Sequence, residues 1–243
     1  RLSEEAGASF IDINMGCPAR KVTSGMSGSA LMRDIDNAIQ LIVATINSVD
    51  VPVTLKMRLG WDNDSLNAPL LAVKAQEAGI KMIVVHGRTR CQFYDGKADW
   101  SAVKETVDAV DIPVFVNGDI NTAHDAIEAL DKSCAAGVMV GRSLIGSPWR
   151  LQEIISAVDG SVIPMKLKIS DKKKIVLDHY NDIINFYGEK KGVKIARKHL
   201  IGYIDDLNLI NGSEIKSSIV QMSQSSAVYN ILNTTFSKAG EDS

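Results

Sequence analysis

The sequence predicts an α/β protein in which part of a (β/α)8 TIM barrel is followed by an all-helical domain. Short apolar, β-branched runs alternate with helical stretches up to about residue 157. Such alternation indicates a parallel sheet whose strands are joined by crossover helices. After about Pro164 the strand candidates end and only helical patterns follow. We therefore expect a partial barrel carrying the catalytic site over residues 1–160 and a helical domain over residues 165–243.

Five strands and four helices are expected in the first domain. The strand candidates are 10–14, 53–58, 82–86, 114–117 and 137–140, and the helices between them are 36–48, 66–78, 100–110 and 123–130. Pro52 and Pro113 mark strand starts, and Gly79 separates a helix from the next strand. In the second domain, apolar residues at helical spacing predict helices over 170–187, 193–207, 213–223 and 226–236, with Ser170 as the first N-cap.

The spacing of about 30 residues per unit fits either a barrel or a doubly wound sheet, and the strand ends favour the barrel. Every strand candidate ends in polar residues: Asn14, then Lys56 and Arg58, then His86-Gly87-Arg88, then Asn117-Gly118-Asp119, then Gly141-Arg142. In a barrel all these ends meet at one mouth, where barrel enzymes hold their active sites. In a doubly wound sheet only the switch point would carry such residues.

The last two strand ends have the composition of a phosphate site. Asn117-Gly118-Asp119 and Gly141-Arg142 offer glycine N–H groups, and each precedes a helix. Barrel enzymes commonly bind phosphate after strands 7 and 8. If these are strands 7 and 8, the first strand here is strand 4. We then expect roughly 80 to 100 residues with strands 1–3 to precede Arg1, at about 30 residues per unit.

Cys17 is the first candidate for chemistry, because it lies three residues beyond the strand end at Asn14. Gly16 and Pro18 bracket it and exclude regular secondary structure there. Such a thiol could be a nucleophile, a metal ligand, a proton donor or an idle loop residue. Cys91 also follows a strand, and from the residues alone it is an equal candidate.

Charge and composition narrow the class of protein. The net charge is −2, but ten Lys or Arg stand against five acids between Met165 and Asp205. That segment suits either a local contact with a polyanion or a solvated helix surface. No apolar run is long enough to span a bilayer, and no cluster has metal-ligand spacing, so we expect no membrane insertion and no metal site. Three Cys without paired spacing fit a reducing cytoplasm.

A series of motifs, in order over nearly the whole chain, resembles the signature of the bacterial tRNA-dihydrouridine synthases. The motifs are NMGCPARKV at 14–22, GSAL at 28–31, KMRLGW at 56–61, HGRTR at 86–90, NGDI at 117–120 and GR at 141–142. The helical segment ARKHL at 196–200 is similar to the B type of that family. The family's flavin-wrapping first strand and a Gln of its third strand have no counterpart here.

The resemblance implies an FMN enzyme that reduces a uridine of tRNA to 5,6-dihydrouridine with NADPH, with no obligate protein partner. It implies that Cys17 is the catalytic proton donor to uracil C5. The cofactor residues it implies are Lys56 and His86 near the flavin, with Asn117, Gly118, Asp119, Gly141 and Arg142 at its phosphate. The substrate residues it implies are Asn14 and Arg58 at the uracil, with Arg20, Lys21, Arg197 and Lys198 on the tRNA.

Two other functions stay open from the residues. Lys56 could form a Schiff base, because barrel aldolases carry such a lysine on a strand. The chain could also be a non-catalytic fragment that only binds RNA through its helical domain, with strong salt dependence. A flavin-coloured preparation would support the dihydrouridine synthase, and borohydride trapping of a carbonyl substrate would support the aldolase.

Overall fold

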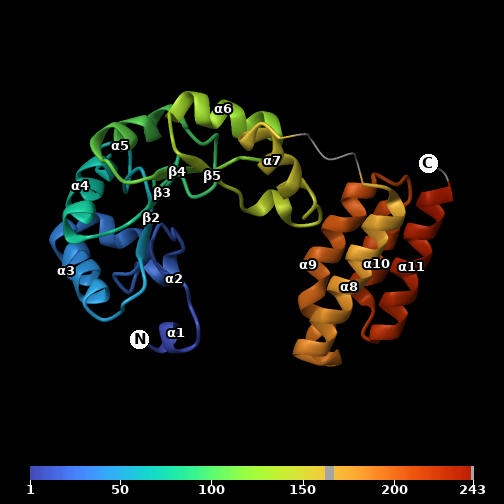
Figure 1. The fold of residues 1–243 in the computed structure, drawn as a ribbon. Coiled ribbons are helices and arrows are strands. Elements are labelled where there is room, and N and C mark those ends of the chain that lie inside the picture. Colours follow the sequence, from blue (N-terminus) through green and yellow to red (C-terminus); the bar gives the residue numbers. More distant parts are fainter. Residues whose placement is uncertain (162–166, 242–243) are drawn as a thin grey trace. The chain divides into compact units, whose positions relative to one another are not determined.

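The computed structural model describes residues 1–161 and 167–241, and the chain divides into two compact units (Figure 1). The first unit is Arg1–Gly141 and the second is Arg142–Ser243. The domain ranges expected from the sequence, 1–160 and 165–243, stay predictions. Pro164, residue 165 and the basic residue Lys166 lie outside the described part of the chain.

The first unit is built from βα repeats. It begins with α1 (Leu2–Glu5), β1 (Ile11–Met15), α2 (Arg20–Thr23) and the 3-10 helix η1 (Gly28–Arg33). It continues with α3 (Ile35–Ile46), β2 (Val53–Arg58), α4 (Ala68–Ala78), β3 (Ile83–His86), η2 (Ser101–Val103), α5 (Lys104–Ala109), β4 (Val114–Asn117), α6 (Ala123–Ser133) and β5 (Gly137–Met139).

The five strands form one parallel sheet in the order β1-β2-β3-β4-β5. Neighbours in space are thus neighbours in sequence, as in a (β/α)8 barrel, whereas a doubly wound sheet reverses its order at a switch point. Helices α3, α4, α5 and α6 follow one another along one side of the sheet (Figure 1). The predicted class, consecutive barrel strands followed by helices, is confirmed.

The buried side of the sheet explains why these segments became strands. Met15, Met57, Val85 and Val116 stand in one row across four strands, and none of them is exposed to solvent. Because side chains alternate along a strand, the residues before and after this row point to the opposite face. That opposite face carries the polar residues described below.

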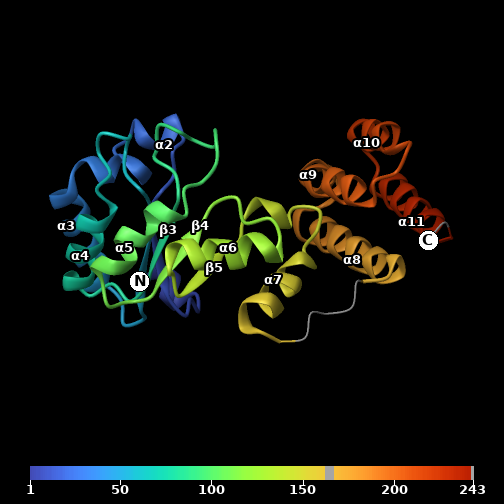
Figure 2. The same cartoon turned by 90° about the horizontal axis from the view of Figure 1, so that it is seen from above.

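The second unit is helical. It contains η3 (Arg142–Leu144), α7 (Arg150–Asp159), α8 (Ile169–Tyr187), α9 (Glu189–Leu207), α10 (Gly212–Gln221) and α11 (Ser225–Glu241). Helices α8 and α9 lie side by side (Figures 1 and 2), and α8 also packs against α11. Their shared core holds fully buried residues from all three helices, among them Val176, Tyr180, Leu200, Tyr203, Leu232 and Phe236.

A buried carboxylate fastens residues 142–160 to this bundle. Asp206 on α9 accepts hydrogen bonds from Ser147 Oγ at 2.6 Å and from Lys172 Nζ at 2.7 Å, and its third donor is Arg150 at 3.2 Å. Burial raises the pKa of Asp206, but the bonds from Lys172 and Ser147 outweigh burial, so the pKa lies below its ordinary value. The carboxylate is therefore charged at neutral pH and joins α7, α8 and α9.

Several expected boundaries are wrong for physical reasons. Helix α9 begins at Glu189 rather than at residue 193, because Gly188 ends α8 and the next helix starts at once. Gly192 lies within this helix, and its missing side chain lets α9 approach α8, since a Cβ there would lie 3.0–3.1 Å from Ile183 and Ile184. Ser170 is not an N-cap: α8 starts one residue earlier, with Lys168 at the cap position and no side-chain cap.

Other boundaries shift by small amounts. The first strand is Ile11–Met15 instead of 10–14, and Phe10 is more than half exposed. The helix expected over 100–110 divides into the 3-10 turn η2 and the short α5. The strands at 53–58 and 114–117 have the expected bounds. Among the described helices, none is both long and apolar enough to cross a membrane.

The contact between Gly146 and Gly202 generates a stability prediction. Gly146 has φ +86°, and a Cβ there would collide with the backbone of Gly202 on α9. Gly160 has a similar φ of +71° but nothing within 4 Å of its would-be Cβ. Both alanine variants acquire left-handed strain of about 1–2 kcal/mol, and only Gly146→Ala adds overpacking of about 1–3 kcal/mol.

We therefore expect urea unfolding followed by circular dichroism to show a clearly larger loss of stability for Gly146→Ala than for Gly160→Ala. Equal losses in the two variants would contradict the close glycine–glycine packing.

Candidate active site

Five polar residues share the face of the sheet opposite the helices. Asn14 is in register with Lys56, and Arg58, His86 and Asn117 form a second row two residues further along. Because side chains repeat every two residues along a strand, all five point to the same side. The sequence-based prediction that the strand ends gather polar groups at one place agrees with this register.

The backbone around Cys17 is fixed at several points. The side chain of Asn14 accepts from the N–H groups of Gly16 at 3.0 Å and Cys17 at 3.1 Å. The carbonyl oxygen of Cys17 accepts from the N–H of Ser29 at 3.1 Å and from its hydroxyl at 2.8 Å. Gly28 has φ +57°, and a Cβ there would lie 2.8 Å from that carbonyl. The half-buried thiol is therefore presented from a rigid turn.

Arg58 joins this turn to a second loop. Its guanidinium is only 1% exposed and donates from Nε to the carbonyl of Gly16 at 2.8 Å. It also donates to the carbonyls of Thr89 at 2.8 Å and Phe93 at 2.9 Å. The structure thus shows Arg58 holding two loops in place, and the uracil contact implied for it stays a prediction.

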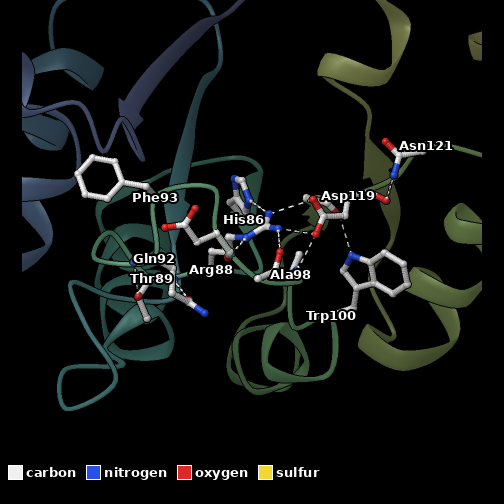
Figure 3. A network of polar contacts seen from close by, with 12 residues as sticks. His86, Arg88, Thr89, Gln92, Phe93, Ala98, Trp100, Asp119 and Asn121 are labelled. Carbon is white, nitrogen blue, oxygen red and sulfur yellow. Dashed lines mark hydrogen bonds and ion pairs between the residues drawn. The ribbon is translucent and has the colours of Figure 1, made fainter.

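Arg88 is the centre of a larger network (Figure 3). All five of its N–H groups have acceptors: Asp95 O at 3.1 Å, His86 Nε2 at 3.2 Å, Gly96 O at 2.6 Å, and Asp119 Oδ1 and Oδ2 at 3.0 and 2.6 Å. The two-pronged bond to Asp119 is the strongest geometry that an arginine and a carboxylate can form. It links the ends of β3 and β4 to loop 89–96.

The expected phosphate turn is shaped by this network. Asp119 accepts a third bond from the N–H of Ala98 at 2.8 Å. Burial raises the pKa of Asp119, but the bonds from Arg88 and Ala98 outweigh burial and lower it. Gly118 has φ +113°, and a Cβ there would lie 2.8–2.9 Å from Ala98 and the His86 ring. The Asp119 carboxylate is therefore held within the fold, and the phosphate role predicted for Asn117, Gly118 and Asp119 stays a prediction.

Electrostatics sets the protonation of the two basic strand residues. Burial, followed by the positive charges of Arg58, Lys56 and Arg88, lowers the pKa of His86 to about 3, so its ring is neutral at pH 7. Because Arg88 donates to Nε2, the neutral ring carries its proton on Nδ1. Burial and Arg58 also lower the pKa of Lys56.

Lys56 is tied into the sheet through an amide. Its Nζ donates to Asn117 Oδ1 at 3.1 Å, and Asn117 Nδ2 donates to the carbonyl of Met139 at 2.8 Å. The chain of bonds runs from β2 through β4 to β5, so two of the expected cofactor residues, Lys56 and Asn117, lie in direct contact.

The remaining predicted residues lie elsewhere. Arg20 and Lys21 are exposed on α2, just after the Cys17 turn. Gly141 closes the first unit and Arg142 opens the second, so the phosphate role predicted for this pair stays a prediction. On α9, Lys198 is exposed, whereas Arg197 donates to the carbonyl of Met222 at 3.1 Å.

Two residues hold the site together without a specific role in the sequence reasoning, which counted Arg88 only among the polar strand ends and gave Ser29 no role. Arg88 follows His86 by two positions, so the strand period could have placed it beside that ring. Ser29 lies twelve residues from Cys17, and no periodicity connects the two. Cys91 is exposed on loop 89–96, and its N–H donates to the carbonyl of Trp61 at 2.8 Å. Within the described ranges no group of three or more His, Cys, Asp or Glu could hold a metal ion.

Sequence comparison places the chain among known proteins. The family model described as dihydrouridine synthase (Dus) matches residues 1–240. The chain belongs to the dihydrouridine synthase family. It is 48% identical over 238 residues to a probable tRNA-dihydrouridine synthase of Rhodobacter capsulatus, covering 98% of this chain and 72% of that protein. It is 38% identical over 206 residues to tRNA-dihydrouridine synthase B of Salmonella typhimurium, covering 85% and 64%.

The family match confirms the resemblance drawn from the motifs. The chain spans 62–72% of the length of the curated relatives it matches. Among solved structures, a mandelate oxidase variant with the monooxide FMN adduct is 17% identical with a TM-score of 0.39, over 96% of this chain and 77% of that one. The family assignment rests on the sequence matches.

The Arg88 network predicts a large effect for a charge-conserving change. Lysine has three donors and no fork, so Arg88→Lys leaves at least two of the five buried bonds unmade. Each buried acceptor left unpaired costs about 1–3 kcal/mol, so two of them should lower the unfolding free energy by about 2–6 kcal/mol. Loop 89–96 should also become more sensitive to limited proteolysis.

Exposed Arg20 on α2 offers the matched control, because Arg20→Lys should change stability by less than about 0.5 kcal/mol. An Arg88→Lys variant as stable and as protease-resistant as the Arg20→Lys variant would refute the central role of Arg88.

His86 predicts a pH dependence of stability. Its pKa is about 3 in the folded chain and 6.5 ordinarily, so the unfolded chain takes up a proton below pH 6.5 that the folded chain refuses. Stability from this group is complete above pH 6.5 and is lost as the pH falls toward 3. Each pH unit inside that window costs about 1.4 kcal/mol.

The measurement is urea unfolding at pH 7.5, 5.5 and 4.5 for the wild type and for His86→Gln, whose amide oxygen can still accept from Arg88. The wild type should lose stability more steeply, and parallel pH profiles would exclude a buried neutral His86.

Proposed function

We propose that this chain carries the proton donor and flavin-facing residues of a tRNA-dihydrouridine synthase that reduces a uridine of tRNA with NADPH. The observation that carries the proposal is the rigid turn that presents Cys17 beside the polar sheet face holding Lys56 and His86. Membership of the dihydrouridine synthase family over residues 1–240 supports it.

The residues present suit an FMN cofactor. Lys56 and Asn117 place an ammonium group and an amide on one sheet face, and the backbone of Gly118 lies against Ala98 and the His86 ring, where a side chain would not fit. We propose that Lys56, His86 and Asn117 contact the flavin ring system, and that the backbone at Gly118 and Gly141, with Arg142, holds its phosphate. Bound FMN supplies the hydride for uracil C6, which no side chain can supply.

The chain itself supplies the proton and the electrostatic setting. Uracil C5=C6 is polarised by the C4 carbonyl, so a hydride at C6 must be matched by a proton at C5. Cys17 is the donor in this proposal, because its turn presents a thiol, a group that can give up a proton as a general acid. Positive Lys56 stabilises negative charge on the reduced ring. The resulting Cys17 thiolate regains its proton from solvent.

Substrate contacts are proposed at two places. Asn14 and Arg58 contact the uracil, and exposed Arg20 and Lys21 contact the RNA near Cys17. The target base must leave its stack, which costs a few kcal/mol unless it lies in a single-stranded loop. Contacts between the phosphate backbone and basic residues such as Arg197 and Lys198 of α9 offset that cost. A tRNA substrate implies that the protein works in the cytoplasm.

The activity is tested with this chain, and with the chain completed to the length of its relatives, in the presence of FMN, NADPH and tRNA lacking dihydrouridine. We expect Cys17→Ala to slow product formation about 10²–10⁴-fold, the usual contribution of a positioned acid. Dihydrouridine in digested tRNA is quantified by mass spectrometry. Cys91→Ala, which removes an exposed thiol on loop 89–96, should react at the wild-type rate.

Two outcomes would contradict the proposal. A Cys17→Ala variant as fast as the wild type would remove Cys17 from the reaction. A folded, flavin-bound wild type without product would point to another flavin substrate, and borohydride trapping of a carbonyl compound on Lys56 would point to an aldolase.

A further inference from the structure

The corner between α8 and α9 exposes two aromatic side chains. Phe186 is 81% exposed and Tyr187 is 41% exposed. Their rings meet edge to face, with centroids 4.8 Å apart and planes at 80°. We call this pair the aromatic corner. A ring as exposed as that of Phe186 offers a free π-face, which folding alone does not require.

Cations surround the aromatic corner. Lys191 Nζ lies 5.3 Å from the centroid of the Tyr187 ring. Lys190, Lys194 and Lys198 follow at four-residue spacing on α9 and are all exposed, so they line one side of the helix. We call these three residues the lysine row. Tyr187, Lys191 and Lys194 also line one shallow hollow in the surface.

The acids near the corner do not cancel this charge. Glu189 accepts from both the N–H and the hydroxyl of Ser225, at 2.8 and 2.7 Å, and so caps α11. The bonds from Ser225 lower the pKa of Glu189, so its carboxylate stays charged, but it is one negative charge beside four lysines. Asp182 lines a second shallow hollow, one helical turn before Phe186. The α9 side of the corner therefore remains cationic.

This combination fits single-stranded RNA better than another protein surface. Unpaired bases stack on exposed aromatic rings whatever their sequence, and nearby lysines bind the adjoining phosphates. A second copy of this chain would bring its own lysine row against the first, so like charges would oppose a dimer here. A purely apolar partner would leave the lysine row unmatched.

We propose that the aromatic corner and the lysine row form an RNA-binding surface, in which an unpaired base stacks on Phe186 and its neighbouring phosphates lie along Lys190, Lys194 and Lys198. The identity of the RNA as tRNA rests on the proposed function. The proposal of a stacking surface itself rests on the exposure of Phe186, the geometry of the two rings and the charge of the lysine row, all within the helical unit.

The first test is the affinity of the intact chain for fluorescein-labelled tRNA transcript and for a single-stranded RNA oligomer. Phe186→Ala should weaken both by about 5- to 100-fold, the range of one base–aromatic stack. Phe186→Leu should weaken binding almost as much, because it stays apolar but has no π-face. Ile210→Ala is the matched control, since Ile210 is fully exposed on the same unit, and it should bind as the wild type does.

A second readout does not depend on affinity. Phe186→Trp keeps an aromatic ring and should retain binding, and stacking should quench the new tryptophan fluorescence when RNA is added. Replacing Lys190, Lys194 and Lys198 by Gln should lower the slope of log affinity against log salt by about 0.7 for each phosphate that the protein then leaves unneutralised. Lys238→Gln, an exposed lysine on α11, should leave the slope unchanged.

The outcomes separate this proposal from the proposed function. If wild type and Phe186→Ala bind RNA equally and both form dihydrouridine, the surface is refuted and the function stands. If the single-stranded oligomer binds through Phe186 but no tRNA product forms, the surface stands and the function is refuted. Self-association that Phe186→Ala abolishes, without an effect on RNA, would show a dimer interface and overturn the proposal.

Discussion

The ion pair between Arg88 and Asp119 is the interaction on which the rest of the site depends. It ties the end of β3 to the turn after β4, and the same guanidinium fixes Asp95, Gly96 and the ring of His86. A buried pair of this kind is favourable only when every donor is used, and here all five are. Arg58 also bonds to loop 89–96, through the carbonyls of Thr89 and Phe93, and it bonds to the Cys17 turn through the carbonyl of Gly16. The two arginines therefore connect the Cys17 turn to the turn after β4.

Buried arginines also determine what chemistry the sheet face supports. Arg58 and Arg88 keep their charge, so the weaker bases beside them, His86 and Lys56, have lowered pKa values. A neutral His86 can accept from Arg88, and it is a far weaker acid than a protonated imidazole would be. Three basic side chains, Lys56, Arg58 and Arg88, face two nearby carboxylates, Asp12 and Asp119. This excess of positive charge favours an electron-rich ligand, and a flavin that becomes anionic on reduction meets that requirement.

The strand period made half of this site predictable. Asn14, Lys56, His86 and Asn117 are recognisable because β-branched runs alternate and end in polar residues, which places those residues on one face. The loop contacts were not predictable, since Asp119 and its partner are 31 residues apart and meet only because Asp119 adopts φ +54°. The motif at 117–119 indicated a phosphate site from its glycine, yet its carboxylate acts within the fold. The sequence motif alone does not show that the Asp119 carboxylate pairs with Arg88.

The basic segment between Met165 and Asp205 is a second case in which composition does not show which charges are paired. From composition it could be a polyanion site or a solvated surface, and the structure divides it between structural and free charges. On α8, Lys172 is buried against Asp206, Lys173 donates to Ser237 and Lys174 pairs with Asp178. On α9, Lys190, Lys194 and Lys198 face solvent beside two exposed rings. An RNA phosphate would have to break existing bonds to reach the lysines of α8 but not those of α9. Within the helical unit, the α9 lysines are therefore better placed than the α8 lysines for the proposed RNA contact.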